Sequence, residues 1–534
     1  MFGKIRQQLL RIRSLPLLLA VVLSSIIILS VGIVFAQYTG TLSIEGSAHF
    51  QYTNAPTLVL SNPSTNFSIF RGNTNFTPAQ LTTRLTALSE LDGDITPSIY
   101  RECSQNEISI PCPDSWREWE AGDYTMTYHV IDSLGRPSLP VVMNISIWNF
   151  IDIEFSMYHG VALGSDGSVW TWGANGDGQR GLGNTTSASN YPTPTQIPQS
   201  ALGDLPAVSI AAGGNTSCAV NIAGVAYCWG AGGSGEIGNG STSSVVSSPT
   251  AVLMPAGVSF KQISASKGTS NPGSFGAVGS DGNVYVWGSG TGYTLGTGNT
   301  SNRSSPIKIT STDDIVYASQ GNRGGAAVTE SGQVYVWGAN NYGQLALGNT
   351  SAANATTSKP NLVAGITDVS RVSYGGYSNY GFIIALKTNG DVWGWGWGYG
   401  IRGSASPSSQ TTPIQIAGVS DIRYINAAAD FTHFVTGNQV YAVGYANYGE
   451  LFGGNTTTRN TPTLSTLANV ADNVGLIAGG YSNAFMLDKD GVMVWGIGYS
   501  SADNQSFGSN TWPAGSNSTN AVIPWTINTP VIES

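Results

Sequence analysis

VALGSDGSVWTWG at residues 161–173 introduces a pattern that returns along most of the chain. GAVGSDGNVYVWG stands at 276–288 and AAVTESGQVYVWG at 326–338. Each copy joins two apolar runs through a short turn that contains Gly, and the second run ends in Trp-Gly. Two such runs around a Gly turn are typical of a β-hairpin. We therefore predict one hairpin in every copy.

The copies are evenly spaced along the chain. Their Trp-Gly positions are Trp172-Gly173, Trp229-Gly230, Trp287-Gly288, Trp337-Gly338, Trp395-Gly396 and Trp495-Gly496, with Val443-Gly444 in the sixth place. A Gly-rich segment with Asn-Thr follows most of them, such as LGTGNTS at 295–301. A period of about 50 residues with several strands in each unit indicates a β-propeller. Seven copies fit a closed ring, which leaves no open sheet edge.

The register of each hairpin follows from its loop. A three-residue loop at Ser165-Asp166-Gly167 sets Ala162 opposite Trp170. The same register pairs Ala219 with Tyr227, Ala277 with Tyr285, Ala327 with Tyr335 and Ala385 with Trp393. A small residue opposite a large one suits close packing on one face. The register also sets Cys218 opposite Cys228, at a separation that suits a disulfide.

Composition agrees with short strands and tight turns. Of the 534 residues, 68 are Gly and only 10% are charged, while 41% are hydrophobic. Gly, Asn, Ser and Thr are poor helix formers, so we predict an all-β fold, and the length predicts two or more domains. The net charge is −9, from 22 basic and 31 acidic residues. Without a basic patch beyond the N-terminus, we expect no nucleic-acid partner.

The four cysteines form two close pairs, Cys103 with Cys112 and Cys218 with Cys228. Closely spaced pairs are typical of disulfides in an oxidising compartment. A metal site would need further ligands, and the histidines lie outside a ligand spacing from either pair. We therefore favour two disulfides over a metal site.

Residues 1–36 are typical of an export sequence. Basic residues between Lys4 and Arg13 precede an almost uncharged stretch, and this order predicts that the C-terminal side is exported. Val34-Phe35-Ala36 resembles a signal-peptidase site, yet residues 15–36 are also long enough to anchor the chain in a membrane. Both interpretations, signal peptide and membrane anchor, place the remainder outside the cell or at its surface.

The repeats resemble those of the regulator of chromosome condensation family. The resemblance rests on AAGGNTSCAVNIAGVAYCWG at 211–230 and VYVWGANNYGQLALGNT at 334–350. It implies a seven-bladed β-propeller of the exported bacterial type over residues 150–534. The histidine of the family's repeat is retained at His159 and His433, which implies a packing role for both.

Residues 56–148 have a different pattern. Alternating apolar positions in TMTYHVID at 125–132 and VVMNISIW at 141–148 predict β-strands. LDGDITPSI at 91–99 and the segment around Asp132 resemble bacterial immunoglobulin-like surface domains. The resemblance implies a β-sandwich over 56–148, preceded by a linker at 37–55 and an N-terminal hydrophobic helix.

WGWGWGYG at 393–400 is the most unusual aromatic run in the chain. Its first two tryptophans, Trp393 and Trp395, occupy core positions of the repeat. Trp397 and Tyr399 continue past the repeat into the following loop, where aromatic side chains commonly anchor a partner. These two residues are the candidate binding residues.

Three acidic residues near Gly turns are candidates for calcium: Asp92, Asp94 and Asp132. Asp-Gly and Asp-x-x-Gly sequences also form turns in which the carboxylate bonds to nearby backbone, and we favour that role. The Gly-rich segments lack the Lys of a phosphate loop, so we expect no cofactor. No nucleophile and base are paired in the repeats, which predicts a protein that is not an enzyme.

These features favour an exported or membrane-anchored interaction protein whose propeller loops bind a protein partner. Loops from every blade gather on one face of a propeller, where a rigid scaffold places recognition. A surface propeller that binds or hydrolyses glycans is an alternative. The family resemblance adds a third reading, a regulator like a guanine-nucleotide exchange factor, against which the export signal and the acidic chain argue.

The C-terminal segment AVIPWTINTPVIES at 521–534 contains alternating apolar positions. A ring of blades needs its last and first members joined. We predict that this segment supplies the closing strand beside the blade that begins near Phe150.

Overall fold

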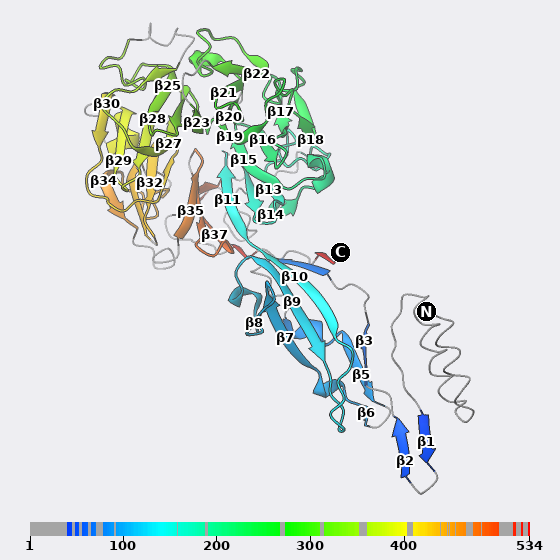
Figure 1. Ribbon diagram of the computed structural model, residues 1–534. Coiled ribbons are helices and arrows are strands. Elements are labelled where there is room, and N and C mark those ends of the chain that lie inside the picture. Colours follow the sequence, from blue (N-terminus) through cyan, green and yellow to red (C-terminus); the bar gives the residue numbers. More distant parts are fainter. Residues whose placement is uncertain are drawn as a thin grey trace. The chain divides into compact units, whose positions relative to one another are not determined.

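The computed structural model is nearly all β and divides into two compact units (Figure 1). Unit 1 comprises Met1–Ile69, Asn73–Ile147 and Pro530–Ser534, and unit 2 comprises Phe70–Gly72 and Trp148–Thr529. The structure describes residues 40–44, 48–52, 56–61, 66–70, 78–89, 92–156, 158–186, 191–267, 273–309, 314–351, 360–402, 409–437, 439–445, 447, 449–453, 455–465, 474–481, 483–500, 516–518, 525–526 and 532–533. The predicted helix at 1–36 lies outside this set. Within it, no helix is long and apolar enough to cross a membrane.

Unit 1 packs two sheets around one core. One sheet has the strand order β40 (Ile532–Glu533), β4 (Asn66–Phe70), β10 (Val141–Trp148), β9 (Gly122–His129), β7 (Tyr100–Gln105) and β8 (Ile108–Ile110). The other has the order β3 (Thr57–Leu60), β5 (Leu85–Ser89) and β6 (Gly93–Asp94). Alternate residues of β9, Tyr124, Met126 and Tyr128, are buried, as the period-2 pattern predicts. Leu85 from the smaller sheet joins the same cluster, so both sheets share one core.

Unit 1 also contains short elements outside these sheets. The segment predicted as a linker holds a hairpin of β1 (Gly40–Ile44) and β2 (Ala48–Tyr52). The short helices are α3 (Pro78–Thr82), η1 (Thr96–Ser98) and η2 (Trp116–Glu118).

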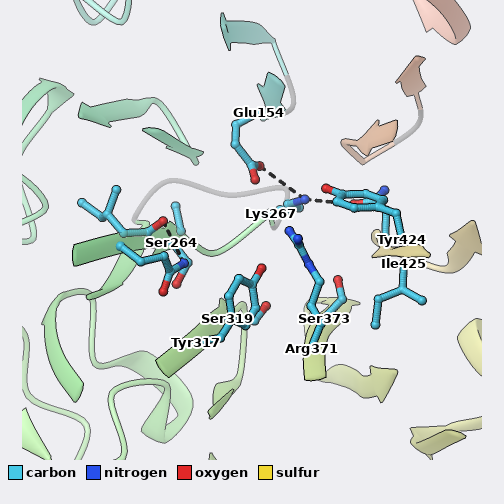
Figure 2. Close-up of a pocket in the computed structure, with 13 residues that line it drawn as sticks. Glu154, Ser264, Lys267, Tyr317, Ser319, Arg371, Ser373, Tyr424 and Ile425 are labelled. Atoms are coloured by element: carbon cyan, nitrogen blue, oxygen red, sulfur yellow. Dashed lines mark hydrogen bonds and ion pairs between the residues drawn. The ribbon is translucent and has the colours of Figure 1, made fainter. Parts of the chain in front are cut away.

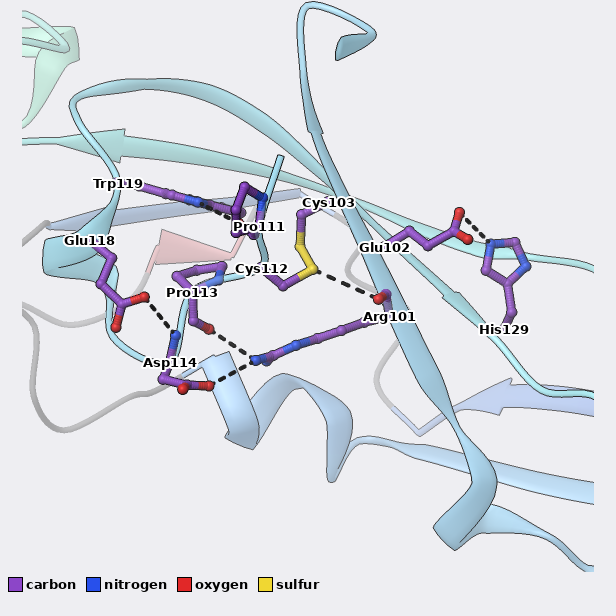
Figure 3. Close-up of a disulfide and its surroundings, with 10 residues drawn as sticks. All are labelled: Arg101, Glu102, Cys103, Pro111, Cys112, Pro113, Asp114, Glu118, Trp119 and His129. Atoms are coloured by element: carbon purple, nitrogen blue, oxygen red, sulfur yellow. Dashed lines mark hydrogen bonds and ion pairs between the residues drawn. A yellow bond between two sulfur atoms is a disulfide. The ribbon is translucent and has the colours of Figure 1, made fainter. Parts of the chain in front are cut away.

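A disulfide joins Cys103 of β7 to Cys112, which follows β8, as predicted (Figure 3). The Arg101 guanidinium beside it donates to the Pro113 carbonyl at 3.0 Å and to Asp114 Oδ1 at 3.3 Å. The Trp119 indole N–H donates to the Pro111 carbonyl. Because these contacts lie on both sides of Cys112, the segment after β8 is held against β7 by more than the disulfide.

Among its described residues, unit 2 contains seven sheets that follow one another along the chain, each a meander of consecutive strands. Sheet 1 contains β11 (Phe150–Phe155), β12 (His159–Gly164), β13 (Val169–Gly173) and β14 (Tyr191–Gln196). Sheet 2 contains β15 (Ala207–Gly213), β16 (Thr216–Asn221), β17 (Ala226–Ala231) and β18 (Val245–Ala251). Sheet 3 contains β19 (Phe260–Ala265), β20 (Ser274–Gly279), β21 (Val284–Gly288) and β22 (Arg303–Ile309). Sheet 4 contains β23 (Ile315–Gly321), β24 (Gly324–Thr329), β25 (Val334–Gly338) and β26 (Asn361–Leu362).

The remaining sheets repeat the same order. Sheet 5 contains β27 (Val369–Tyr377), β28 (Tyr380–Lys387), β29 (Val392–Trp397) and β30 (Ser409–Gln415). Sheet 6 contains β31 (Tyr424–Ala427), β32 (Phe431–Val435), β33 (Val440–Gly444) and β34 (Arg459–Leu464). Sheet 7 contains β35 (Val474–Gly479), β36 (Asn483–Asp488), β37 (Met493–Ser500) and β38 (Ser516–Ser518), with β39 (Trp525–Thr526) also on β37. The short helices of this unit are η3 (Gln199–Leu202), η4 (Thr291–Tyr293) and α4 (Gly398–Arg402).

The predicted hairpin register is confirmed in sheets 1 to 5. The observed pairs are Ala162 with Trp170, Ala219 with Tyr227, Ala277 with Tyr285, Ala327 with Tyr335 and Ala385 with Trp393. Cys218 pairs with Cys228, and the two form the second predicted disulfide. Sheets 6 and 7 depart from the small-and-large rule, because Phe434 pairs with Tyr441 and Met486 with Trp495.

Two residue assignments in the last sheets are wrong. Trp495 was assigned to the Trp-Gly position, but in sheet 7 Ile497 takes it, opposite Ala484, as Trp172 lies opposite Gly160. Trp495 follows the hairpin Gly491 by four residues, whereas Trp172 follows Gly167 by five, and the turn between the paired residues Leu487 and Val494 is one residue longer than that between Leu163 and Val169. His433 likewise lies two positions beyond the histidine position of the repeat, where sheet 6 has Phe431 opposite Gly444.

In sheets 2, 3 and 5 the tryptophan of the repeat joins its sheet to the loop before it. Trp229 Nε1 donates to the Gln179 carbonyl at 2.7 Å, and Trp395 Nε1 donates to the Gln344 carbonyl at 2.9 Å. Gly181, at φ +71°, lies against the Trp229 ring, and a Cβ there would come within 2.8 Å of Nε1. The recurring Gly-rich loop is therefore shaped to receive the next sheet's tryptophan.

Neighbouring sheets are also joined through serine side chains on their first strands. Backbone N–H groups of the next sheet donate to Ser264, Ser319 and Ser373 Oγ, at 3.0, 3.0 and 2.9 Å. The first strands of adjacent sheets form no ladder with one another, so these hydroxyls satisfy backbone groups that burial would leave unpaired.

The first and last sheets are in contact. β11 contacts both β15 and β35, and the rings of Phe155 and Phe485 stack with centroids 4.0 Å apart. The Phe150 N–H donates to the carbonyl of the hairpin residue Gly491 at 2.8 Å. The same contact links sheet 1 to sheet 2, where the Ala207 N–H donates to the Gly167 carbonyl.

The prediction of a closing strand at 521–534 is wrong for its described residues. Trp525–Thr526 pairs with β37 of sheet 7, and Ile532–Glu533 pairs with β4 of unit 1. Neither pairs with β11. The four strands of sheet 1 already follow one another along the chain, from β11 to β14. Sheet 1 is joined to sheet 7 by packing of their faces in a shared core cluster.

Candidate functional site

Seven aromatic side chains form a continuous cluster over sheets 4 to 7, which we name the aromatic patch. Its members are Tyr342, Tyr377, Tyr380, Trp397, Tyr399, Tyr445 and Tyr481. Trp397 lies at the centre, with ring centroids 4.6 Å from Tyr380, 5.2 Å from Tyr399 and 5.8 Å from Tyr377. The patch then reaches Tyr445 and Tyr481, so it crosses boundaries between sheets.

Local sequence explains why the patch forms on sheet 5. The residue after the Trp-Gly pair is small in the first four repeats, as at Ala174 and Ser289, but is Trp397 in the fifth. Trp397 extends β29 by pairing with Ser409, and α4 follows directly. Gly400 of α4 lies against the Phe382 ring, where a Cβ would come within 2.2 Å. The absence of a side chain there lets the turn of α4 sit close to the sheet.

The two predicted binding residues differ in exposure. Trp397 retains only 7% of its surface exposed and packs into the core cluster of sheets 5 and 6. Tyr399 is half-buried on α4, between Trp397 and Tyr445. Tyr445 is 37% exposed, and its hydroxyl accepts a hydrogen bond from Asn447 Nδ2 at 2.8 Å. Trp397 therefore forms the buried base of the patch, while Tyr399 and Tyr445 form part of its accessible surface.

A carboxylate lies beside the patch. Burial raises the pKa of Asp430, in the turn between β31 and β32, to about 7. Burial also raises the pKa of Tyr377 to about 12, with the charge of Asp430 adding to the effect. The faces of aromatic rings carry negative potential as well, so this surface favours cationic groups.

Sequence reasoning missed most of the patch. The five tyrosines come from four repeats, and no single segment contains more than two of them. Tyr377 ends β27 and Tyr380 begins β28, while the others lie in loops: Tyr342, Tyr445 and Tyr481. One signal was available: Gly-Gly-Tyr-Ser-Asn occurs at both 375–379 and 479–483. This repetition places a tyrosine in the same turn of sheets 5 and 7.

The calcium candidates hold turns in unit 1. Asp132 Oδ1 accepts from the Leu134 and Arg136 N–H groups, and its other oxygen pairs with the Arg136 guanidinium at 2.6 Å. Burial alone would raise the pKa of Asp132, but these donors hold it below the ordinary value. Asp92 Oδ2 accepts from the Ser133 N–H and Asp94 Oδ1 from the Thr96 N–H. Among the described residues, no cluster of three potential metal ligands occurs.

Both histidines of the propeller repeats are fully buried. Burial lowers the pKa of His159 and of His433 to about 4, so both are neutral at physiological pH. His433 Nε2 lies 2.8 Å from the Glu450 carbonyl, which it meets as a donor. These environments are those of packing residues.

Comparison with protein families identifies the class. The chain contains regulator of chromosome condensation (RCC1) repeats, matched at residues 166–220, 281–328 and 331–380, with a second model of the same repeat at 150–179 and 315–344. The predicted repeat family is therefore confirmed.

Two individual proteins match part of this chain. The ultraviolet-B receptor UVR8 of Arabidopsis thaliana is 34% identical over 175 residues, which cover 32% of this chain and 37% of the receptor. The human probable E3 ubiquitin-protein ligase HERC3 is 30% identical over 107 residues, 20% of this chain and 10% of the ligase. The chain thus spans about a third of one relative and a tenth of the other.

Solved structures show the same fold. Yeast RCC1 (Prp20), solved bound to Kap60, has a TM-score of 0.56 at 18% identity and covers 69% of this chain and 85% of its own. Prp20p of Saccharomyces cerevisiae, studied for binding to Gsp1p and histones, has a TM-score of 0.55 at 18% identity. The match covers 71% of this chain and 88% of Prp20p. Human WBSCR16 has a TM-score of 0.55 over 68% of this chain and 95% of its own. Unit 2 accordingly has an RCC1-like propeller fold.

Proposed function

We propose that this chain is an exported interaction protein that binds a protein partner through the aromatic patch. The observation that carries the proposal is the continuous cluster of seven aromatic rings across four sheets. Tyr and Trp are enriched among residues that dominate binding energy at protein interfaces. Yeast RCC1 (Prp20) was solved bound to Kap60 and was studied for binding to Gsp1p and histones, which supports the same kind of role here.

Two features of this surface suit a basic partner segment. Asp430 supplies a carboxylate beside Tyr377, and the tyrosine rings attract cations through their faces. We therefore expect Lys or Arg side chains of the partner to lie against the patch.

The proposal includes a closed, seven-bladed ring and an immunoglobulin-like unit 1. The contact between Phe155 and Phe485 and the Phe150–Gly491 hydrogen bond support closure of sheets 1 to 7. The two sheets of unit 1 around one core support a β-sandwich. The basic and then apolar sequence of residues 1–36, together with two disulfides, supports export to the cell surface.

The test compares two immobilised variants with the unaltered full chain. Tyr399→Ala/Tyr445→Ala removes exposed rings of the patch and leaves the buried Trp397 in place. Leu253→Ala removes an exposed apolar side chain outside the patch and serves as the matched control. Each form is incubated with a surface extract of its host, and bound proteins are quantified by mass spectrometry.

We expect at least one protein to be captured by the unaltered chain and by Leu253→Ala, but about tenfold less by the patch variant, as for the loss of an interface hot spot. The captured protein, once purified, should bind the unaltered chain and Leu253→Ala more tightly than it binds the patch variant. Equal recovery from all three forms contradicts the proposal. Patch-dependent capture of polysaccharide instead of protein would favour the glycan-binding alternative.

A further inference from the structure

A pocket lies where the first strands of five sheets meet, and we name it the central pocket (Figure 2). Counted together with the solvent on its open side, its space amounts to about 400 Å³. The side chains that matter here are Glu154 of β11, Lys267 after β19, Tyr317 of β23, Arg371 of β27, and Tyr424 and Asn426 of β31. The lining residues come from sheets 1, 3, 4, 5 and 6 of unit 2.

The guanidinium of Arg371 is held by tyrosine rings packed on its faces. Its guanidinium carbon lies 4.8 Å from the centre of the Tyr317 ring and 4.4 Å from that of Tyr424. The three residues occupy one register position on successive sheets, each two residues before Ser319, Ser373 or Asn426. An arginine stacked between rings keeps its in-plane N–H groups for other acceptors.

The in-plane edge of Arg371 has no protein acceptor within the part of the chain that the structure describes. No hydrogen bond or ion pair to its guanidinium occurs there, and its buried Nε has no partner. A buried donor without a partner is costly, so a site of this kind favours an external acceptor.

Lys267 adds a second cation to the pocket. Its Nζ lies 3.3 Å from Glu154 Oε2 and donates to Asn426 Oδ1 at 3.0 Å, which leaves its third N–H. Only 1% of the surface of Asn426 is exposed, and its Nδ2 has no hydrogen-bond partner among the described residues. Figure 2 shows Lys267 and Arg371 directed toward the same space.

Nearby acids limit the charge of a ligand. Glu154 lines the pocket, and Asp152 lies two residues before it on β11. Burial and the charge of Glu154 raise the pKa of Asp152 to about 6, so the site already disfavours one more negative charge on β11. A phosphate dianion would meet this repulsion twice over, whereas a carboxylate carries a single charge and matches the planar edge of arginine.

We propose that the central pocket binds a small organic monocarboxylate, with both of its oxygens accepting from the edge of Arg371 and one also accepting from Lys267. The stacked tyrosines hold the guanidinium in place before the ligand arrives, so little side-chain entropy is lost on binding. This site is separate from the aromatic patch, and either can fail without the other.

The test uses the full chain and four probes: sodium propionate, neutral propionamide, inorganic phosphate and buffer alone. Saturation-transfer NMR measures probe binding, and thermal unfolding measures stabilisation. Arg371→Lys keeps the charge but removes the planar edge, and Arg423→Lys makes the same change at an exposed arginine outside the pocket. Lys267→Gln tests the second cation if Arg371→Lys does not fold.

We expect propionate to bind and to raise the melting temperature, with propionamide and phosphate at least about tenfold weaker. Arg371→Lys should weaken propionate binding about tenfold, and Lys267→Gln should weaken it several-fold, while Arg423→Lys changes nothing. Three outcomes overturn the proposal: no saturation transfer from propionate, equal binding of propionamide, or unchanged binding in both Arg371→Lys and Lys267→Gln. Tighter binding of phosphate than of propionate overturns the ligand class.

Discussion

Single residues in this molecule owe their behaviour to burial between repeated sheets. His159 lies at the start of β12, opposite Gly173, and is fully buried. Burial disfavours its charged form, and the weaker interaction with the Thr216 backbone does not offset this effect. The histidine therefore couples the stability of sheet 1 to pH.

The pH dependence has a definite sign. The pKa of His159 is about 4 in the folded chain, against an ordinary value of 6.5. Between these values the unfolded chain binds a proton that the folded chain does not, so stability is full above pH 6.5 and falls as the pH drops toward 4. We predict that the unfolding free energy of His159→Gln depends less steeply on pH between 6.5 and 4 than that of the unaltered chain. The difference in slope corresponds to about one bound proton. Urea unfolding at pH 7, 6, 5 and 4 measures the difference, and parallel curves for the two proteins contradict the prediction.

At the scale of one element, the hairpin explains what sequence could and could not foresee. Ala219 opposite Tyr227 and Cys218 opposite Cys228 were predictable because a hairpin's register depends only on its loop. Trp495 was misplaced because it stands one residue nearer its hairpin Gly than Trp172 does, while the turn before β37 is one residue longer than the turn before β13, and only strand pairing reveals this.

Contacts between elements were beyond the reach of the same reasoning. Ser373 Oγ accepts from the Ala427 N–H of the next sheet. The stack of Tyr317, Arg371 and Tyr424 likewise needs three strands about 54 residues apart to be aligned. Alignment of the first strands by their Ser or Asn positions would have brought these three residues together, but their role follows from spatial packing.

The Cys218–Cys228 disulfide stabilises the hairpin of sheet 2 by restricting the unfolded chain. We predict that Cys218→Ala/Cys228→Ala lowers the free energy of unfolding by about 2–3 kcal/mol, as expected for a loop of this length. Chemical denaturation under oxidising conditions measures the loss. In the double variant, stability equal to that of the oxidised unaltered chain would mean that the crosslink contributes nothing.

At the scale of the whole molecule, both proposed sites depend on the arrangement of the sheets. The aromatic patch draws residues from sheets 4 to 7, and the central pocket joins Glu154 of sheet 1 to Lys267 of sheet 3 and Asn426 of sheet 6. The central pocket exists only if sheet 1 lies beside the later sheets. Contact between sheets 1 and 7 is therefore the central claim.

A double-mutant cycle on Phe155 and Phe485 tests that claim most directly. The two residues are 330 positions apart in the sequence and stack with ring centroids 4.0 Å apart. Phe155→Leu, Phe485→Leu and the double variant are compared by urea unfolding, with Phe155→Leu/Phe260→Leu as a control, because Phe260 packs in a different core cluster, on sheet 3. We predict a coupling energy of about 0.5–1.5 kcal/mol for Phe155 with Phe485, and none for the control pair. Additive effects within about 0.3 kcal/mol for both pairs would contradict closure of the ring.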